Sequence, residues 1–269
     1  MIIKTMPFDL EQTFECGQCF RWNKNSHGGY TGVAHGKLVN IRQFEGYAEL
    51  DDDDDVWNTY FDIDTDYNSI IEKLSVGDVM KNAIAKGSGI RILRQDFFET
   101  VISFIISQNN NIPRIKSIVE NLCARFGKKI ADGYYAFPEA ETLASLERED
   151  LAFLRAGYRD AYIIDAAKKI SAGEINKEIV FGGTIEDARN EISRIKGVGP
   201  KVADCILLFG AARGEVFPTD VWMKRVLTEL YGFENLTPKA INAFARENFG
   251  NLAGYAQQYL FYSMRENKS

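Results

Sequence analysis

The most constraining stretch of this 269-residue chain lies between residues 192 and 220, where two helices are expected on either side of a tight turn. Its residues predict the end of one helix, a tight turn at Gly197-Val198-Gly199, and a second helix that begins at Pro200. In such a turn, the backbone amides and the start of the helix point outward together, which makes a binding site for phosphate groups. The segment therefore predicts contact with a phosphate-bearing partner.

Two polar residues of this stretch are candidates for chemistry. Lys201 lies in the first turn of the second helix, where the helix dipole disfavours a cation and so favours the neutral, nucleophilic amine. Asp220 follows Pro218-Thr219 and is placed as the N-cap of another helix. A turn, a lysine at a helix start and a capping aspartate are each common without a catalytic role. Together they indicate amine chemistry on a nucleic acid.

GVGPKVADCILLF at 197–209, followed by PTDV at 218–221, resembles the helix-hairpin-helix motif and following loop of base-excision DNA glycosylases. The segment is most similar to the 8-oxoguanine DNA glycosylase/AP lyase branch. This resemblance implies a bifunctional enzyme that excises 8-oxoguanine from duplex DNA, preferably opposite cytosine. It also implies that Lys201 attacks the sugar C1′ to form a Schiff base before β-elimination, and that Asp220 stabilises the charge that develops on the sugar.

Four further positions match the base-binding residues of the family. GQCFRW at 17–22 resembles the family segment GQSFRW, whose glycine carbonyl accepts a hydrogen bond from N7–H, a proton that guanine lacks. The resemblance places Gln257 at the Watson–Crick edge of the base and places Phe261 and Cys205 against its ring. Without it, Gly17 is equally typical of a strand entry, and Phe261 and Cys205 of a hydrophobic core.

The resemblance also implies a set of DNA-binding residues with separate tasks. An asparagine fills the space left by the extruded nucleotide, two arginines contact the partner cytosine, and an aromatic residue wedges beside it. The matching positions are Asn109 for the asparagine, Arg114 and Arg159 for the arginines, and Tyr158 for the aromatic residue. The expected hairpin contacts are Gly197, Gly199 and Val202. Judged by its residues alone, the Asn109–Asn111 triplet is also consistent with a loop and a helix N-cap. Trp222 stands where many relatives have histidine, which affects how the 5′ phosphate is held.

Hydrophobic periodicity predicts an α+β fold, with a small N-terminal antiparallel β-sheet subdomain followed by a mostly α-helical body. The resemblance implies that this body contains the helix-hairpin-helix motif. We expect the sheet-rich subdomain to span residues 1–90 and the helical glycosylase domain residues 91–269. Asp96 and Glu99 predict a capping box before a buried helix. Strands are expected near 20–22, 30–33 and 37–41, and helices near 67–74, 78–85, 97–106, 115–126, 139–146, 148–155, 159–171, 184–195, 200–209, 220–231, 237–248 and 251–265.

The charge distribution permits a nucleic-acid partner although the average charge does not suggest one. The net charge is −6, but residues 49–66 contain nine acidic residues and no Lys or Arg, so the rest of the chain carries +3. Double-stranded DNA containing 8-oxoguanine is the expected partner. No apolar run approaches the roughly 20 residues of a membrane span, and no signal peptide is recognised. We therefore expect a monomer in the cytoplasm without a membrane contact, associated with the nucleoid if the source is a prokaryote.

The four cysteines predict neither a disulfide framework nor a metal site. Cys16-x-x-Cys19 with His27 and His35 has a loose spacing and no second CxxC, which disfavours zinc. The C-terminal four-cysteine cluster of iron–sulfur glycosylases is missing as well. No metal and no cofactor are expected.

Two alternative functions stay open at this point. One is a glycosylase for alkylated or other damaged bases, although Lys201 argues against its monofunctional members. The other is a non-catalytic helix-hairpin-helix DNA-binding module, which gives no reason for Lys201, Asp220 and Gly17 to occur together.

Overall fold

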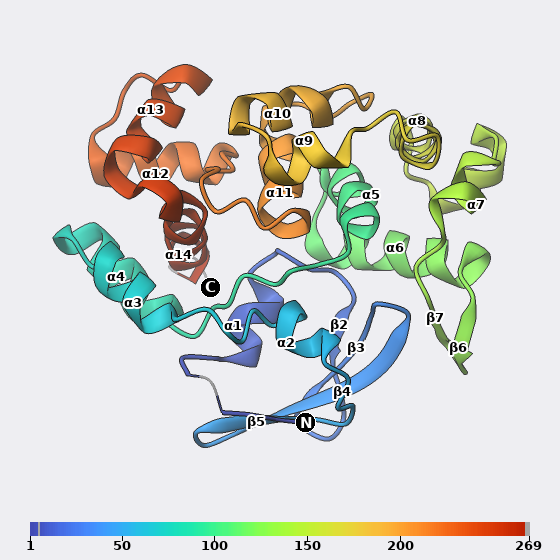
Figure 1. Ribbon diagram of the computed structural model, residues 1–269, viewed down its shortest axis with the longest axis horizontal. Helices are drawn as coiled ribbons and strands as arrows, with labels where there is room; N and C mark the ends of the chain where they lie inside the picture. Colours follow the sequence, from blue (N-terminus) through green and yellow to red (C-terminus); the bar gives the residue numbers. More distant parts are fainter. Residues whose placement is uncertain (5, 267–269) are drawn as a thin grey trace.

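The computed structural model describes residues 1–4 and 6–266. Its N-terminal part is a five-stranded antiparallel sheet with the strand order β1-β5-β4-β3-β2, below two groups of helices (Figure 1). The expected α+β fold, with an antiparallel sheet before a helical body, is confirmed. The strands are β1 (Ile2–Ile3), β2 (Trp22–Lys24), β3 (Tyr30–Ala34), β4 (Lys37–Phe44) and β5 (Tyr47–Leu50).

Aromatic residues fill the space between the sheet and two short helices, α1 (Leu10–Glu15) and α2 (Val56–Tyr60). Phe14 stacks on Trp22 with ring centroids 4.3 Å apart. The Trp22 indole also donates a hydrogen bond to the Tyr60 hydroxyl at 2.7 Å, so its one polar group is satisfied inside the core. In register with Trp22 on the next strand is Gly32, where any side chain would overlap the indole. This packing fixes the chain immediately after the 17–22 segment.

The helices form two groups with separate hydrophobic cores, which lie side by side above the sheet (Figure 1). The first group contains α5 (Phe97–Ser107), α6 (Ile112–Phe126), α7 (Ala140–Ala144), the 3₁₀ segment η1 (Arg148–Leu154), α8 (Arg159–Ser171), α9 (Lys177–Gly182), α10 (Ile185–Ser193) and α11 (Pro200–Gly210), together with the hairpin β6 (Lys129–Ala131) and β7 (Tyr134–Tyr135). The second contains α3 (Tyr67–Leu74), α4 (Gly77–Gly87), α12 (Val221–Tyr231), α13 (Pro238–Phe249), the 3₁₀ turn η2 (Gly250–Leu252) and α14 (Ala253–Glu266).

Close packing of α5 against α11 sets the position of the hairpin. Gly210 faces Thr100, and a Cβ at Gly210 would lie only 2.9 Å from the Thr100 Cβ, so the two helices approach more closely than a larger residue permits. The rings of Phe104 and Phe209 stack at 5.4 Å in the same interface. The N-terminal end of α11 is therefore held on a rigid support.

The expected capping box at the start of α5 forms in one direction. Asp96 accepts a hydrogen bond from the Glu99 amide at 2.9 Å. The Glu99 carboxylate is turned toward the core, 4.0 Å from Nη1 of Arg21. The 148–155 segment, expected as an ordinary helix, is a 3₁₀ helix that ends at Arg155 in the left-handed region, with φ of 51°.

Within residues 1–4 and 6–266, no helix has both the length and the apolar composition needed to cross a bilayer.

Candidate active site

The predicted hairpin joins α10 to α11 through a turn that requires glycine. Gly197 has φ of 81°, and a side chain there would overlap the Tyr162 ring. Gly199 is the N-cap of α11 and has open space on its Cβ side. In the described part of the chain, no side chain caps this helix, and Pro200 follows at its first position. The start of α11 therefore presents unoccupied backbone amides, as phosphate binding requires.

Lys201 projects from the first turn of α11 toward the interior of the protein. Its Nζ lies 5.4 Å from the centroid of the Phe104 ring, within the range of a cation–π contact. One turn later is Cys205, which is buried. Burial raises the pKa of the Cys205 thiol, while the charge and the hydrogen bond of Lys201 oppose that shift. The amine is thus held between an aromatic face and a neutral thiol.

Asp220 is the N-cap of α12, as predicted. Its Oδ1 accepts hydrogen bonds from the amides of Trp222 and Met223, each at 2.9 Å. Among the residues that the structure describes, none donates a hydrogen bond to Oδ2. One oxygen of this carboxylate therefore fixes its position, and the other remains available to a ligand.

Two hollows meet at Lys201 and Asp220, which are the two residues common to their linings. The larger is an open cleft of about 550 Å³ between the α5–α6 turn and the starts of α11 and α12. The smaller is a narrow cavity of about 50 Å³ between α11, α14 and the loop after α1. The cleft lining is Ser107, Gln108, Asn109, Asn110, Lys201, Val202, Thr219, Asp220, Val221, Trp222 and Lys224.

The narrow cavity brings together all four predicted base-binding residues: Gly17, Cys205, Gln257 and Phe261. Gln257 is buried, and its Oε1 has no hydrogen-bond partner within the described residues. A buried amide oxygen without a partner is costly, and such groups are characteristic of ligand sites. With about 50 Å³ of space, the cavity is too small for a purine, so a base enters only if its walls move.

Gly17 is placed by its neighbour Gln18, whose side chain is completely buried. The Gln18 amide donates to the Arg91 carbonyl at 2.8 Å and accepts from the Leu93 amide at 2.9 Å. Gly17 itself has φ of 86°, in the left-handed region. No hydrogen bond is donated to the Gly17 carbonyl by any part of the chain that the structure describes. The loop is therefore rigid while this carbonyl remains available.

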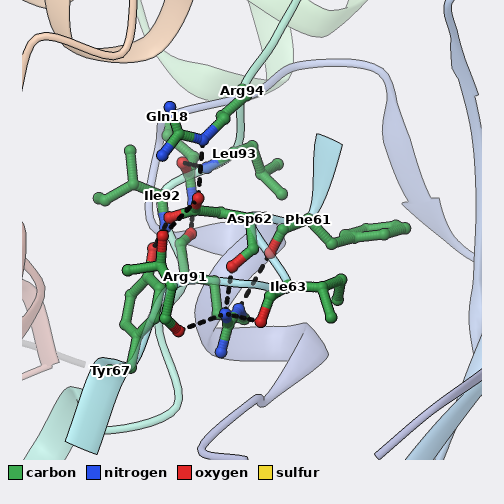
Figure 2. Close-up of polar contacts among 10 residues, drawn as sticks. Gln18, Phe61, Asp62, Ile63, Tyr67, Arg91, Ile92, Leu93 and Arg94 are labelled. Carbon is green, nitrogen blue, oxygen red and sulfur yellow. Dashed lines mark hydrogen bonds and ion pairs between the residues drawn. The ribbon is translucent and has the colours of Figure 1, made fainter. Parts of the chain in front are cut away.

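The segment that holds Gln18 is itself anchored by Arg91, which is fully buried (Figure 2). Its guanidinium donates to a ring of backbone carbonyls, among them that of Phe61 at 2.9 Å, and lies 4.0 Å from the centroid of the Tyr67 ring. Burial lowers the pKa of Arg91. Next to it, Asp62 forms an ion pair with Arg94 at 2.7 Å. These contacts connect the sheet region to the base cavity through Gln18.

The α5–α6 turn presents the expected DNA-binding asparagine at the cleft. Asn109 is exposed and has φ of 47°. Asn111 is the N-cap of α6 and accepts a hydrogen bond from the Arg114 amide at 3.0 Å. The Arg114 side chain is exposed and donates to the Arg155 carbonyl at 3.0 Å. The simpler interpretation of the triplet, a loop with an N-cap, therefore applies to Asn111 and leaves Asn109 directed to the cleft.

The two predicted arginines differ in environment. Arg159 is 7% exposed, and its guanidinium donates to the carbonyls of Gln108, Asn109 and Ala156. Tyr158 is 46% exposed, and its ring centroid lies 4.6 Å from Cζ of Arg159. Arg159 thus supports the Asn109 turn from inside, while Tyr158 covers it from outside.

Sequence reasoning missed two cations near these hollows. Lys224 lies in the first turn of α12, four residues after Asp220, and lines the cleft. Arg265 lies four residues after Phe261 on α14 and places its guanidinium 5.6 Å from the Phe261 ring centroid. In both cases the signal was the helical i, i+4 spacing from a residue already selected.

Two family models and several known proteins match this chain. The family model described as 8-oxoguanine DNA glycosylase, N-terminal domain, matches residues 1–101, and that of the HhH-GPD superfamily base excision DNA repair protein matches residues 102–250. The curated N-glycosylase/DNA lyase OGG1 of Arabidopsis thaliana is 30% identical over 286 residues, which cover 94% of this chain and 76% of the relative.

Solved structures are similar over the whole fold. The structure of MBOgg1 in complex with a low-affinity DNA ligand is 46% identical, with a TM-score of 0.94 over 100% of this chain and 96% of that chain. The Clostridium acetobutylicum 8-oxoguanine glycosylase/lyase, in complex with double-stranded DNA containing cytosine opposite 8-oxoG, is 40% identical. Its TM-score is 0.92 over 97% of this chain and 93% of that chain.

Proposed function

Because the chain belongs to the HhH-GPD superfamily of base excision DNA repair proteins, in its 8-oxoguanine DNA glycosylase branch, we propose that it excises 8-oxoguanine from duplex DNA and then cleaves the strand. The observation that carries this proposal is the meeting of the wide cleft and the narrow cavity at Lys201 and Asp220. A strand in the cleft would turn one nucleotide through this junction, with its sugar beside the amine and its base in the cavity.

Lys201 is the nucleophile in this mechanism. Its neutral amine forms a bond to C1′ as the C1′–N9 bond breaks, and the base leaves with the bonding electrons and takes up a proton. Opening of the sugar ring at C1′–O4′ then gives the imine, a Schiff base. Loss of a C2′ proton expels the 3′ phosphate and cleaves the strand. The Phe104 ring and the Cys205 thiol keep the amine directed to the junction.

Asp220 stabilises the positive charge that develops on the sugar. Its Oδ1 is committed to the start of α12, which fixes the carboxylate before the substrate arrives. A preorganised charge of this kind costs no reorganisation during the reaction and is a large contribution to catalysis. The free Oδ2 is the oxygen assigned to the sugar.

The narrow cavity selects the base. The Gly17 carbonyl accepts a hydrogen bond from N7–H of 8-oxoguanine, whereas guanine presents a lone pair at N7. Gln257 has an unpaired oxygen that accepts from the N1–H and N2–H₂ edge of the base. Phe261 and Cys205 enclose the ring from two sides.

The remaining DNA contacts follow from the rim of the cleft. Asn109 enters the space left by the extruded nucleotide, and Tyr158 packs beside the unpaired base. Of the two arginines expected at the partner cytosine, the exposed Arg114 recognises the base, and the buried Arg159 supports the Asn109 turn beside it. Gly197, Gly199 and Val202 place the α11 amides against the strand. All of these parts come from one chain, and we assign the active form as a monomer.

Cleavage of defined duplexes tests the function. The protein is incubated with duplexes containing 8-oxoguanine, uracil or an alkylated purine, and strand scission is followed without alkali. Scission of the 8-oxoguanine duplex alone agrees with the proposal. Excision of the alkylated base without scission would favour a monofunctional alkylation glycosylase, and tight binding without any excision a non-catalytic module.

A further inference from the structure

Gly17 lies where two distant helices meet. A Cβ built at this position would have three side chains in ordinary van der Waals contact, at 3.6 Å from Arg265, 3.8 Å from Phe261 and 3.8 Å from Ile112. Phe261 and Arg265 belong to α14, and Ile112 is the first residue of α6. The Cα side of the glycine is thus covered by the helix that carries the base-binding residues.

Arg265 contacts both walls of the base cavity at once. Its Nη1 donates a hydrogen bond to the Glu15 carbonyl at 3.2 Å, two residues before Gly17. Its guanidinium also lies over the Phe261 ring, with Cζ 5.6 Å from the centroid. An arginine suits this position because its planar group can stack on a ring while its edge donates a hydrogen bond.

We propose that Arg265 is a positioning residue for base selection, which holds the Gly17 carbonyl and the Phe261 ring in a fixed relative arrangement. This inference rests on the proposed function, because it concerns the selection of 8-oxoguanine. It assigns a task to a side chain that is outside the cavity lining. If the guanidinium is lost, the loop keeps its Gln18 contacts and the Gln258 hydrogen bond to the Cys16 carbonyl, but the Phe261 ring loses the group that sets its position relative to the Gly17 carbonyl. The carbonyl then meets N7–H less well, and 8-oxoguanine loses its advantage over guanine.

Lys116 provides a matched contrast because it also contacts Glu15, next to the same loop. Its Nζ donates to the Trp22 carbonyl at 2.7 Å and lies 3.8 Å from the Glu15 carboxylate. It projects from α6, and neither the Gly17 surroundings nor the cavity lining includes it. Arg265→Met and Lys116→Met each remove one cationic tether of the loop, but only the first removes a contact with Phe261.

The experiment measures binding rather than turnover, so that cleavage does not intervene. Each substitution is introduced into the Lys201→Gln variant, which gives two double variants. Dissociation constants are then determined for two duplexes, one with 8-oxoguanine and one with guanine opposite cytosine. We expect Arg265→Met to narrow the ratio of the two constants by roughly five- to tenfold. Lys116→Met should keep the ratio of Lys201→Gln alone. Thermal melting of both variants shows whether the loop is loosened to a similar degree.

The outcomes separate this inference from the proposed function. An unchanged ratio in Arg265→Met, or an equal narrowing in Lys116→Met, overturns the role of Arg265. A ratio near one in the Lys201→Gln reference itself overturns recognition of 8-oxoguanine. If Arg265→Met fails to fold, Arg265→Lys replaces it, because lysine keeps the charge and a donor for the Glu15 carbonyl but lacks the planar group that lies over Phe261. An unchanged ratio in Arg265→Lys equally contradicts the inference.

Discussion

Asp220 and Met223 are joined by a hydrogen bond of 2.9 Å, so the candidate catalytic carboxylate is also the cap of helix α12. Oδ1 accepts the Trp222 amide as well, while Oδ2 faces no described donor. One oxygen of Asp220 thus caps the helix and the other is available for catalysis. A suitable substitution can test the catalytic role while it keeps the cap.

Asp220→Asn is that substitution, because asparagine caps helices about as well as aspartate. We expect an unchanged melting temperature and unchanged duplex binding, since the Oδ1 contacts can persist. Excision should fall by about 10²-fold or more, because the negative charge beside the sugar is lost. Single-turnover excision measures the expected loss of catalysis, and thermal melting measures the expected unchanged stability. Wild-type excision in this variant would reduce Asp220 to a helix cap.

Lys201→Gln tests the nucleophile. Glutamine has a similar length and cannot form an imine, so borohydride should trap no covalent protein–DNA adduct, whereas the wild-type protein should give one. Duplex binding should persist, because the α11 amides do not depend on this side chain. Gel analysis after borohydride treatment and a binding titration provide the measurements. An adduct of undiminished yield would assign the chemistry to another amine, with Lys224 the first alternative at the same cleft.

Gln257→Leu separates recognition from stability. The Oε1 of Gln257 is buried without a partner, so replacing the amide with an apolar group should leave the free energy of unfolding unchanged or higher. Excision of 8-oxoguanine should nevertheless decrease, because the base loses its hydrogen-bonding edge. The adjacent Gln258 is the control: it is equally buried but donates to the Cys16 carbonyl at 3.2 Å. Gln258→Leu should destabilise the fold by about 1–3 kcal/mol. A large loss of stability in Gln257→Leu would make it a structural residue.

Elements with several turns of regular apolar spacing were predictable from the sequence. The helix expected at 67–74 is α3, and those expected at 159–171 and 115–126 are α8 and most of α6. The short helices α1, α2 and α9 and the β6–β7 hairpin were missed, because five or six residues contain too few repeats to show a period. Nothing in the structure or the comparisons tests the expected domain boundary at residue 90, which stays a prediction.

The candidate site was predictable where its determinants are local. The Gly197 turn and the Asp220 cap each depend on residues within one or two positions, so their residue types indicate the geometry directly. The tether from Arg265 to Glu15 joins residues 250 positions apart, and no local pattern indicates it. The hydrogen bonds from Arg159 to the backbone carbonyls of Gln108 and Asn109 were likewise unpredictable, because they depend on how α8 packs against the α5–α6 turn.

Glu99 should make stability depend on pH. Burial raises the pKa of its carboxyl from 4.5 to about 7, with the Arg21 charge opposing the shift. A carboxyl that binds its proton more tightly in the folded state favours folding at low pH, and this contribution is lost as pH rises toward 7. Glu99→Gln should therefore gain stability relative to wild type between pH 4.5 and 7.5, by up to about 3 kcal/mol. Chemical denaturation across this range measures the difference, and parallel curves for the two proteins would contradict it.

Arg114 is the residue on which we expect opposite-base selection to depend. Once the lesion is extruded, cytosine presents two adjacent acceptors, N3 and O2, which a guanidinium can engage together. Adenine places a donor, N6–H₂, beside N1 and so fits less well. A good bidentate contact gives about 1–3 kcal/mol of discrimination, so wild type should excise 8-oxoguanine faster opposite cytosine than opposite adenine. Arg114→Met should narrow that ratio by roughly five- to a hundredfold without altering borohydride trapping.

Arg159 is the control that distinguishes direct recognition from support of the turn. The exposed Arg114 side chain makes one described hydrogen bond, to the Arg155 carbonyl, so Arg114→Met should leave the melting temperature nearly unchanged. Arg159 is buried among carbonyls that would lose their donor, so Arg159→Met should lower the melting temperature and slow excision from all four opposite-base duplexes. Single-turnover excision from those duplexes distinguishes direct recognition of the partner base from support of the turn. If Arg114→Met keeps the cytosine-to-adenine ratio while Arg159→Met abolishes it, then Arg114 is a surface contact and the buried arginine selects the partner base.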